Sequence, residues 1–126
     1  MNVNRIEQII DERNTGHWNL TRFRSNVYDA CLAAQETAFT EGQLPAQTKA
    51  LIAVGIAIQM GNDARIESKI VRAAALGTEF RQMLEAIEVG IAMGGVTGLE
   101  SARAAFFILD RIYPQEILKI LSLIHI

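Results

Sequence analysis

The stretch Leu44–Gly77, LPAQTKALIAVGIAIQMGNDARIESKIVRAAALG, most constrains what this chain can fold into. Pro45 suits the first turn of a helix, and a Gly-Asn pair ends the apolar run Leu51–Met60. This run has one polar residue, so its helix is expected to be central and covered on all sides. A polar, charged turn follows. The stretch therefore predicts two consecutive helices, over about 45–60 and 63–76.

The rest of the chain has helical spacing as well. Apolar residues recur at steps of three and four, and only two prolines are present. The further predicted helices cover about 4–12, 20–39 and 79–93, then a segment after the break at Gly94-Gly95, and a short last helix from Pro114. The helix at 20–39 is expected to bury one face, made of Phe23, Val27, Cys31, Ala34 and Ala38. We therefore predict an all-α fold.

The last six residues, LSLIHI at 121–126, can be encoded by CTG TCT CTT ATA CAC ATC, which matches a transposon-end adapter used in sequencing libraries. We therefore expect a single domain over residues 1–120, followed by a tail that is not native. The alternative is a genuine apolar helix end. Resequencing the gene from cloned source DNA separates the two, since an unbroken natural codon run through His125 would contradict the adapter. No role is assigned to His125.

Charge and composition exclude several function classes. The 126 residues carry a formal net charge of −2, whereas a nucleic-acid-binding surface needs a basic excess. The longest apolar run is about half as long as a membrane span requires, and the charged N-terminal segment lacks the pattern of a signal peptide. We therefore expect a cytoplasmic protein that binds neither nucleic acid nor membrane. Half of the residues are apolar, which in so small a domain favours burial against other copies of the chain.

Cysteine and histidine are scarce. Cys31 is the one cysteine, which excludes an intrachain disulfide, a CxxC pair and a multi-cysteine metal site. Its spacing on the apolar face predicts a small buried residue. His17 and Trp18 fall in the predicted connection between the first two helices, either as a metal ligand and a stacking residue at a pocket mouth or as an anchor for the N-terminal arm. The anchor is favoured because no second histidine stands at ligand spacing. We expect no metal and no cofactor.

Four phrases in the chain fall in the order and spacing of a known family. They are EGQLPAQTKALIAVGIAIQMG, KIVRAAALGT, EAIEVGIAMGG and ESARAAFFIL. Through them the segment at 41–109 resembles the carboxymuconolactone decarboxylase family, which includes the alkylhydroperoxidase-D-like proteins. The resemblance implies a bundle of about six to seven helices built around a central helical hairpin. It also implies a homo-oligomer, a trimer or a hexamer, with pockets near the subunit contacts.

The peroxidase branch of that family carries a CxxCxxxH motif after the apolar helix, with a glutamate near the start of that helix. A thiol at a helix N-terminus has a lowered pKa, and a histidine one turn further can relay a proton together with the glutamate. In this chain the cysteine positions fall on Asn62 and Arg65, the histidine on Lys69 and the glutamate on Ala50. The resemblance therefore implies the family's scaffold without its thiol peroxidase chemistry.

Three cations stand near these positions. Arg65, Lys69 and Arg72 are spaced i, i+4 and i+7, so they form one basic stripe along the second helix of the hairpin. Either they bind a small anion, such as a carboxylate or a phosphate, or they face solvent and pair with acidic side chains, at little gain in stability. The acidic side chains considered are Glu67, Glu85 and Glu88.

Two functions follow as hypotheses. The first is a non-redox, oligomeric binding or structural protein on the family's scaffold. The second is an enzyme that acts on a small carboxylate or lactone through Lys69 and Arg65, although the decarboxylase branch typically has histidine where Lys69 stands. An enzyme needs a proton-transfer group, and Asp63, Glu67 or Lys69 would have to supply it. A thiol peroxidase that uses Cys31 alone would need this thiol exposed and its pKa lowered.

Overall fold

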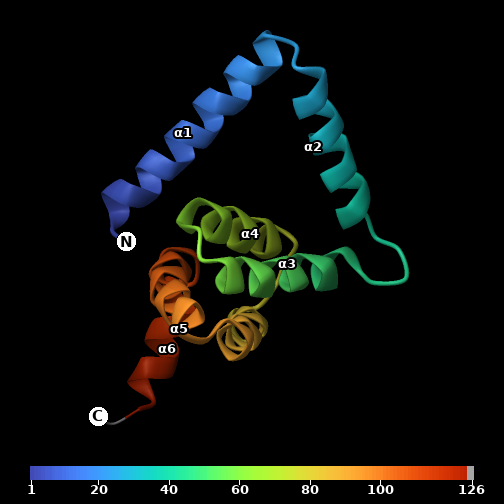
Figure 1. Cartoon of the computed structure of the whole chain (residues 1–126). Helices are drawn as coiled ribbons and strands as arrows, with labels where there is room; N and C mark the ends of the chain where they lie inside the picture. Colours follow the sequence, from blue (N-terminus) through green and yellow to red (C-terminus); the bar gives the residue numbers. More distant parts are fainter. Residues whose placement is uncertain (125–126) are drawn as a thin grey trace.

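The computed structural model describes residues 1–124, which form six helices and no strand (Figure 1). The helices are α1 (Val3–Arg22), α2 (Asn26–Phe39), α3 (Ala46–Met60), α4 (Asp63–Ala75), α5 (Phe80–Ile112) and α6 (Pro114–Ser122). The predicted all-α class is confirmed. His125 lies outside the described residues. None of the six helices combines the length and the apolar character that crossing a membrane requires.

Helices α3 and α4 form the predicted hairpin. Gly61 ends α3 in the left-handed region, at φ 81°, which a residue without a Cβ adopts at no steric cost. The Asn62 side chain then accepts a hydrogen bond from the Arg65 backbone N–H at 2.9 Å and caps α4. Helix α5 packs against both helices of the hairpin, so the three helices enclose the core. The most deeply buried side chains are Val54, Ile58, Ile66, Ile70, Met83, Ile108 and Leu109.

Helix α3 and the first half of α5 approach each other closely at Gly90. A Cβ at this position would lie 2.6 Å from the Ile58 Cβ and 2.7 Å from the Gly55 carbonyl oxygen, so a side chain there would push the two helices apart. The prediction that α3 is covered on all sides is wrong. Ile52 and Ile56 are about half exposed, because the neighbouring helices cover only part of its circumference.

Helix α5 contains the predicted break. Gly95 has φ 57° and ψ −130°, a non-helical conformation that kinks the helix. The two halves of α5 correspond to the two helices predicted on either side of the Gly-Gly pair. After α5, the buried Tyr113 hydroxyl donates to the Thr78 carbonyl oxygen at 2.7 Å, and α6 follows with Pro114 in its first turn.

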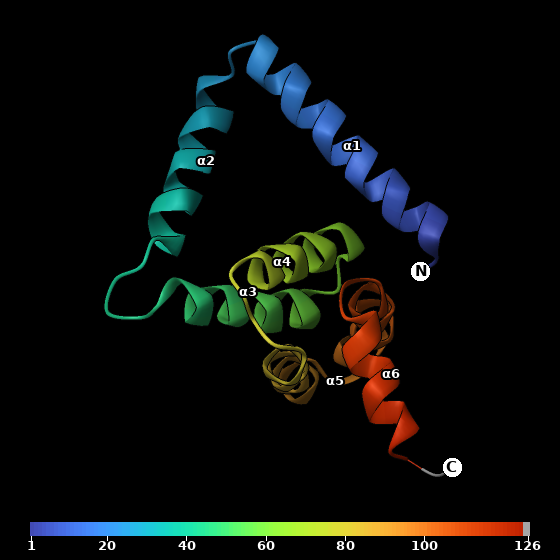
Figure 2. The ribbon, with the colours of Figure 1, turned by 180° about the vertical axis from the view of Figure 1, so that it is seen from behind.

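Helices α1 and α2 form an arm that extends from the core as the two limbs of a V (Figures 1 and 2). Helix α1 has 20 residues, so its predicted end near residue 12 is wrong. Gly16 alone does not stop it, because no breaker follows and a glycine inside a helix costs only about 1 kcal/mol. Ile6 and Ile9 are buried, so the N-terminal half of α1 is the part that packs against the core.

Two ion pairs also hold α1 to the core. Arg111 of α5 donates to Glu7 at 2.5 Å. Arg13 pairs through both terminal nitrogens with Glu67 of α4, whose side chain is 2% exposed, whereas that of Arg13 is 40% exposed. A buried carboxylate is therefore neutralised by an arginine that reaches it from the arm.

The second limb of the arm starts later than predicted. Arg24 takes the left-handed conformation at φ 53°, which interrupts the helix predicted over 20–39. The Ser25 side chain then accepts a hydrogen bond from the Tyr28 backbone N–H at 3.2 Å and caps a new helix, α2.

The predicted burial of the α2 apolar face is wrong. No residue of α2 is buried. Phe23 and Val27 are 86% and 75% exposed, and Cys31, Ala34 and Ala38 are exposed as well. The spacing is that of a buried stripe, but no other segment of residues 1–124 packs over it.

Candidate functional site

The predicted basic stripe lies on the side of α4 that meets the C-terminal end of α2. The Lys69 Nζ lies 5.3 Å and the Arg72 Cζ 4.5 Å from the centroid of the Phe39 ring. A cation within about 6 Å of an aromatic face is attracted to the ring electrostatically. The arm and the core together therefore form a basic–aromatic cluster, consisting of Arg65, Lys69, Arg72 and Phe39.

One carboxylate joins the basic–aromatic cluster. Glu36 of α2 accepts from the two terminal nitrogens of Arg72 at 3.1 and 3.5 Å, and none of the glutamates considered from the sequence takes that place. Glu36 is largely exposed, so solvent screens this pair and it contributes little to stability. Among residues 1–124, neither Lys69 nor Arg65 has a salt bridge. The single carboxylate therefore pairs with one of the three cations, and the cluster keeps a surplus of positive charge.

Lys69 is the cation of the cluster whose pKa is shifted by its surroundings. Partial burial lowers the pKa of Lys69 below its ordinary 10.5, and the guanidinium groups of Arg72 and then Arg65 lower it further, whereas Glu36 raises it. The folded protein therefore destabilises the charged form of this lysine. An anion bound beside Lys69 would offset the repulsion among the three cations.

The remaining positions of the family motif carry no reactive group. Ala50 is buried in α3 and has no polar side chain. The Asn62 side chain is engaged in capping α4. Arg65 donates from Nη1 to the Met60 sulfur at 3.2 Å and remains exposed. Of the four positions, only Arg65 and Lys69 present groups that can interact with a ligand.

The three proton-transfer candidates do not share one site. Glu67 precedes Lys69 by about half a turn around α4 and faces α1, where Arg13 binds it. Asp63, one turn before Glu67, lies on the same side of the helix and is half-buried. Both carboxylates therefore lie on the opposite side of α4 from the basic stripe, and Lys69 is the one candidate within the cluster.

His17 and Trp18 lie on α1 rather than in a connection. The His17 Nδ1 and the Tyr28 hydroxyl are 2.6 Å apart and form a hydrogen bond between the two limbs of the arm. Trp18 is mostly exposed and does not pack against the core. Within residues 1–124, no three His, Cys, Asp or Glu side chains lie close enough together to hold a metal ion.

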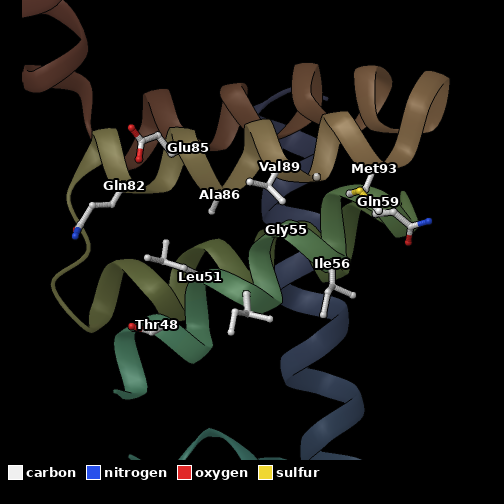
Figure 3. Close-up of a pocket in the computed structure, with 12 residues that line it drawn as sticks. Thr48, Leu51, Gly55, Ile56, Gln59, Gln82, Glu85, Ala86, Val89 and Met93 are labelled. Carbon is white, nitrogen blue, oxygen red and sulfur yellow. The ribbon is translucent and has the colours of Figure 1, made fainter. Parts of the chain in front are cut away.

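A second feature, which the sequence interpretation missed, is an apolar groove of about 680 Å³ between α3 and α5 (Figure 3). Its walls are mainly aliphatic, and Glu85 is its one charged lining residue. The aliphatic lining residues are Leu51, Ile52, Ile56, Ala86 and Val89, and Met93 adds an apolar thioether. No residue of the basic–aromatic cluster lines the groove, so the two features are separate surfaces of the molecule.

A signal for the groove is present in the sequence. The run Leu51–Met60 is apolar on more sides than two neighbouring helices can cover, so part of it had to remain accessible in a single chain. Gly55 and Gly90 allow α3 and α5 to approach closely, and the larger side chains beside them then form the walls of the groove.

Comparisons with known proteins agree with the fold. A model of the carboxymuconolactone decarboxylase family matches residues 25–107, whereas no curated protein matches the chain. The structure is similar to that of a protein from Thermotoga maritima, with a TM-score of 0.78 and 17% identity over 87% of this chain and 96% of that one. It is also similar to the apo form of a carboxymuconolactone decarboxylase family protein from Legionella pneumophila, with a TM-score of 0.76 and 19% identity over 85% and 96%. At these identities the similarity establishes a shared fold.

Proposed function

Because the chain belongs to the carboxymuconolactone decarboxylase family, we propose that it is a non-redox, self-associating member that binds a small anion at the basic–aromatic cluster. The observation that carries the proposal is the surplus of positive charge around Phe39. Of Arg65, Lys69 and Arg72, only Arg72 pairs with a carboxylate among residues 1–124, and repulsion between like charges at this spacing costs about 0.2 to 0.5 kcal/mol per pair, which a bound anion would offset. A carboxylate or phosphate would pair with Lys69 and Arg65, while the Phe39 ring would contact an apolar part of the ligand.

The non-redox part of the proposal rests on thiol chemistry. A dithiol relay needs two cysteines that can form a disulfide, and the sequence has only Cys31. Cys31 is exposed on α2, so a single-thiol peroxidase remains a distinct alternative. Peroxide consumption measured with a dithiol reductant tests it. We expect no turnover above that of Cys31→Ser, and turnover that this substitution abolishes would contradict the proposal.

Self-association is part of the proposal because many large apolar side chains are exposed. They include Trp18, Phe23, Val27, Ile56, Val89, Met93 and Val96. Exposed apolar surface of this extent is typical of a protein interface. We expect a trimer or a hexamer in the cytoplasm, and light scattering coupled to size-exclusion chromatography measures its mass.

A thermal-shift screen at low salt tests anion binding. Inorganic phosphate, small aliphatic carboxylates and benzoate are compared on the native chain, on Lys69→Ala and on Lys119→Ala, an exposed lysine of α6 that serves as the matched control. A ligand that binds the folded state raises its apparent stability by mass action. We expect a rise in Tm with the native chain and the control but not with Lys69→Ala. An equal rise in all three proteins, or none in any, would sink the proposal.

A second candidate function is catalysis on a small carboxylate or lactone, and the lowered pKa of Lys69 favours it. A lysine whose pKa moves toward neutrality is better able to exchange a proton with a substrate, and Arg65 would hold the substrate carboxylate. Compounds that raise Tm are assayed for lactone opening and release of carbon dioxide. Turnover that Lys69→Arg abolishes while binding persists would support catalysis, whereas absence of turnover with bound ligands would leave a binding protein.

A further inference from the structure

Within residues 1–124, an apolar face of α2 and the apolar groove between α3 and α5 are both left uncovered, and they lie on different parts of the molecule. The first, the arm face, consists of Val27, Cys31, Ala34 and Ala38 on α2, all exposed. The second is the apolar groove between α3 and α5. The arm face has the i, i+4, i+7, i+11 spacing of a helix that packs against an apolar surface, and the groove has the form that receives such a helix.

The arm face does not meet the groove of its own chain. Other side chains of α2 already contact the chain from a different side of the helix: Tyr28 bonds His17, Glu36 bonds Arg72, and Phe39 lies beside Lys69. These contacts hold α2 above α4, on the side of the hairpin away from the first half of α5 (Figures 1 and 2). The arm face is left pointing away from these contacts, and no other segment of residues 1–124 covers it.

The two surfaces match in length and in size of side chain. The arm face spans eleven helical steps, from Val27 to Ala38, or about 16 Å. The groove lining spans the same number of steps along α3, from Thr48 to Gln59, and along α5, from Gln82 to Met93. Three of the four residues of the arm face are small, which lets the α2 backbone settle between walls formed by large aliphatic side chains.

The charges beside the two surfaces are also complementary. Arg22 and Arg24 lie just before the arm face, at the turn between α1 and α2. Glu85 is the one charged residue of the groove, and Thr48 and Gln82 lie at the same end (Figure 3). The basic turn of one molecule would therefore lie near the acidic end of the groove in another, which sets the direction in which α2 enters.

We propose that the arm face of one copy packs into the apolar groove of a second copy. The inference rests on the proposed self-association and adds which surfaces form it. The contact is heterologous, because each molecule offers its arm face to one neighbour and its groove to another, and such contacts close into a ring when the rotation allows. The same helix carries Phe39 and Glu36, so assembly also fixes the side of α2 that covers Lys69. Assembly would therefore hold Phe39 and Glu36 more firmly in the contacts that they already make with Lys69 and Arg72 within one chain.

Disulfide trapping tests the contact directly, because Cys31 is a native thiol on the arm face. The native chain is mixed with a longer, tagged chain that carries Cys31→Ser and Val89→Cys, and the mixture is oxidised mildly with copper phenanthroline. Subunit exchange before oxidation brings the two chains into one assembly. We expect the main cross-linked product on a non-reducing gel to be one native and one tagged chain.

The other products of this experiment would each overturn the proposal. Native–native dimers alone would indicate that arm faces meet each other, and tagged–tagged dimers alone would indicate that grooves meet. The control is a tagged chain with Cys31→Ser and Gln115→Cys, whose thiol is exposed on α6 outside the groove. If this control forms as much mixed product as the Val89→Cys chain does, the cross-links come from random collision.

Complementation gives a second, independent measurement. Val27→Glu places a charge on the arm face and Ile56→Glu places one in the groove, and each protein alone should fall to monomer mass. An equimolar mixture contains one intact arm face and one intact groove for each pair, so a dimer mass should return. If both variants keep the native mass, the assembly uses other surfaces and only this inference fails. If the native chain itself is monomeric, the proposed self-association fails with it.

Discussion

The core helices α3 to α5 and the arm helix α2 have similar apolar spacing but opposite surroundings. Val54 and Ile58 on α3 are four residues apart, as are Ile66 and Ile70 on α4, and all four are at most 1% exposed. Val27 and Cys31 recur at the same kind of interval and are exposed. Periodicity therefore predicts which side of a helix needs cover, whereas a neighbouring element of suitable shape determines whether the chain itself supplies that cover.

The largest change in stability is expected at the ion pair that joins α1 of the arm to α4 of the core. Arg13→Met leaves the buried Glu67 carboxylate without its partner and should lower the free energy of unfolding by about 3 kcal/mol. Glu67→Gln should cost less, because the arginine left behind is partly exposed and can be solvated. Urea unfolding at one protein concentration measures both. Equal losses would mean that the pair, rather than the burial of the carboxylate, determines the cost.

The next largest change in stability is expected at Gly90, where α3 and α5 approach each other closely. A Cβ at Gly90 would lie within 2.8 Å of the Cβ and Cγ2 of Ile58 and of the Gly55 carbonyl oxygen. Gly90→Ala should therefore separate α3 from α5 and destabilise the fold by about 2 kcal/mol, despite the better helix propensity of alanine. Thermal unfolding measures the change, and a neutral result would show that α5 can shift without loss.

A glycine-to-alanine substitution in the arm should instead raise the stability of the protein. Gly16 lies inside α1, and a Cβ there would meet no atom within 4 Å. Gly16→Ala should stabilise the protein by about 0.5 to 1 kcal/mol, since alanine loses less backbone entropy in a helix. Hydrogen exchange should slow in α1 in particular. A destabilised protein would indicate that the open side of α1 at Gly16 is a packed contact between copies.

The smallest change in stability is expected at the basic–aromatic cluster, and this change depends on pH. Because the pKa of Lys69 is lowered in the folded state, the unfolded chain holds more protons between that lowered pKa and 10.5. Stability therefore rises with pH across this window, and the penalty for the charged lysine is fully present below it. Lys69→Met should stabilise the protein by about 0.5 kcal/mol or less at pH 7, and the gain should vanish above pH 10.5.

Urea unfolding of Lys69→Met and Lys119→Met from pH 7 to pH 11 in a buffer of low anion content checks this prediction. Lys119 is exposed on α6, so its substitution should show no such trend. A gain that persists at the highest pH would indicate an effect of packing rather than of charge.

Much of the fold was predictable because local residues determine it. Pro45, Gly61 and Gly95 act through their own backbone preferences, so the hairpin and the break in α5 follow from the sequence. The basic stripe was predictable for the same reason, since helical spacing alone places Arg65, Lys69 and Arg72 on one side of α4. The end of α1 was predicted wrongly because Gly16 weakens a helix without stopping it.

The partners of these residues were not predictable in the same way. Phe39 lies 30 residues before Lys69 and Glu36 lies 36 residues before Arg72, and no local pattern connects these pairs. The pairing of Arg13 with Glu67 was not predictable either, because nothing in the sequence distinguishes the buried Glu67 carboxylate, or the arginine that reaches it, from ordinary surface charges.

The all-α class, the hairpin, the family and the absence of a second thiol follow from the sequence alone, because backbone preferences and residue identities act over a few positions. The ends of α1 and α2, the apolar faces that are covered, the attachment of the arm and the carboxylates that lie away from the basic stripe follow only from the three-dimensional structure. These properties depend on side chains brought together from distant parts of the chain, and burial and charge pairing act through space rather than along the sequence.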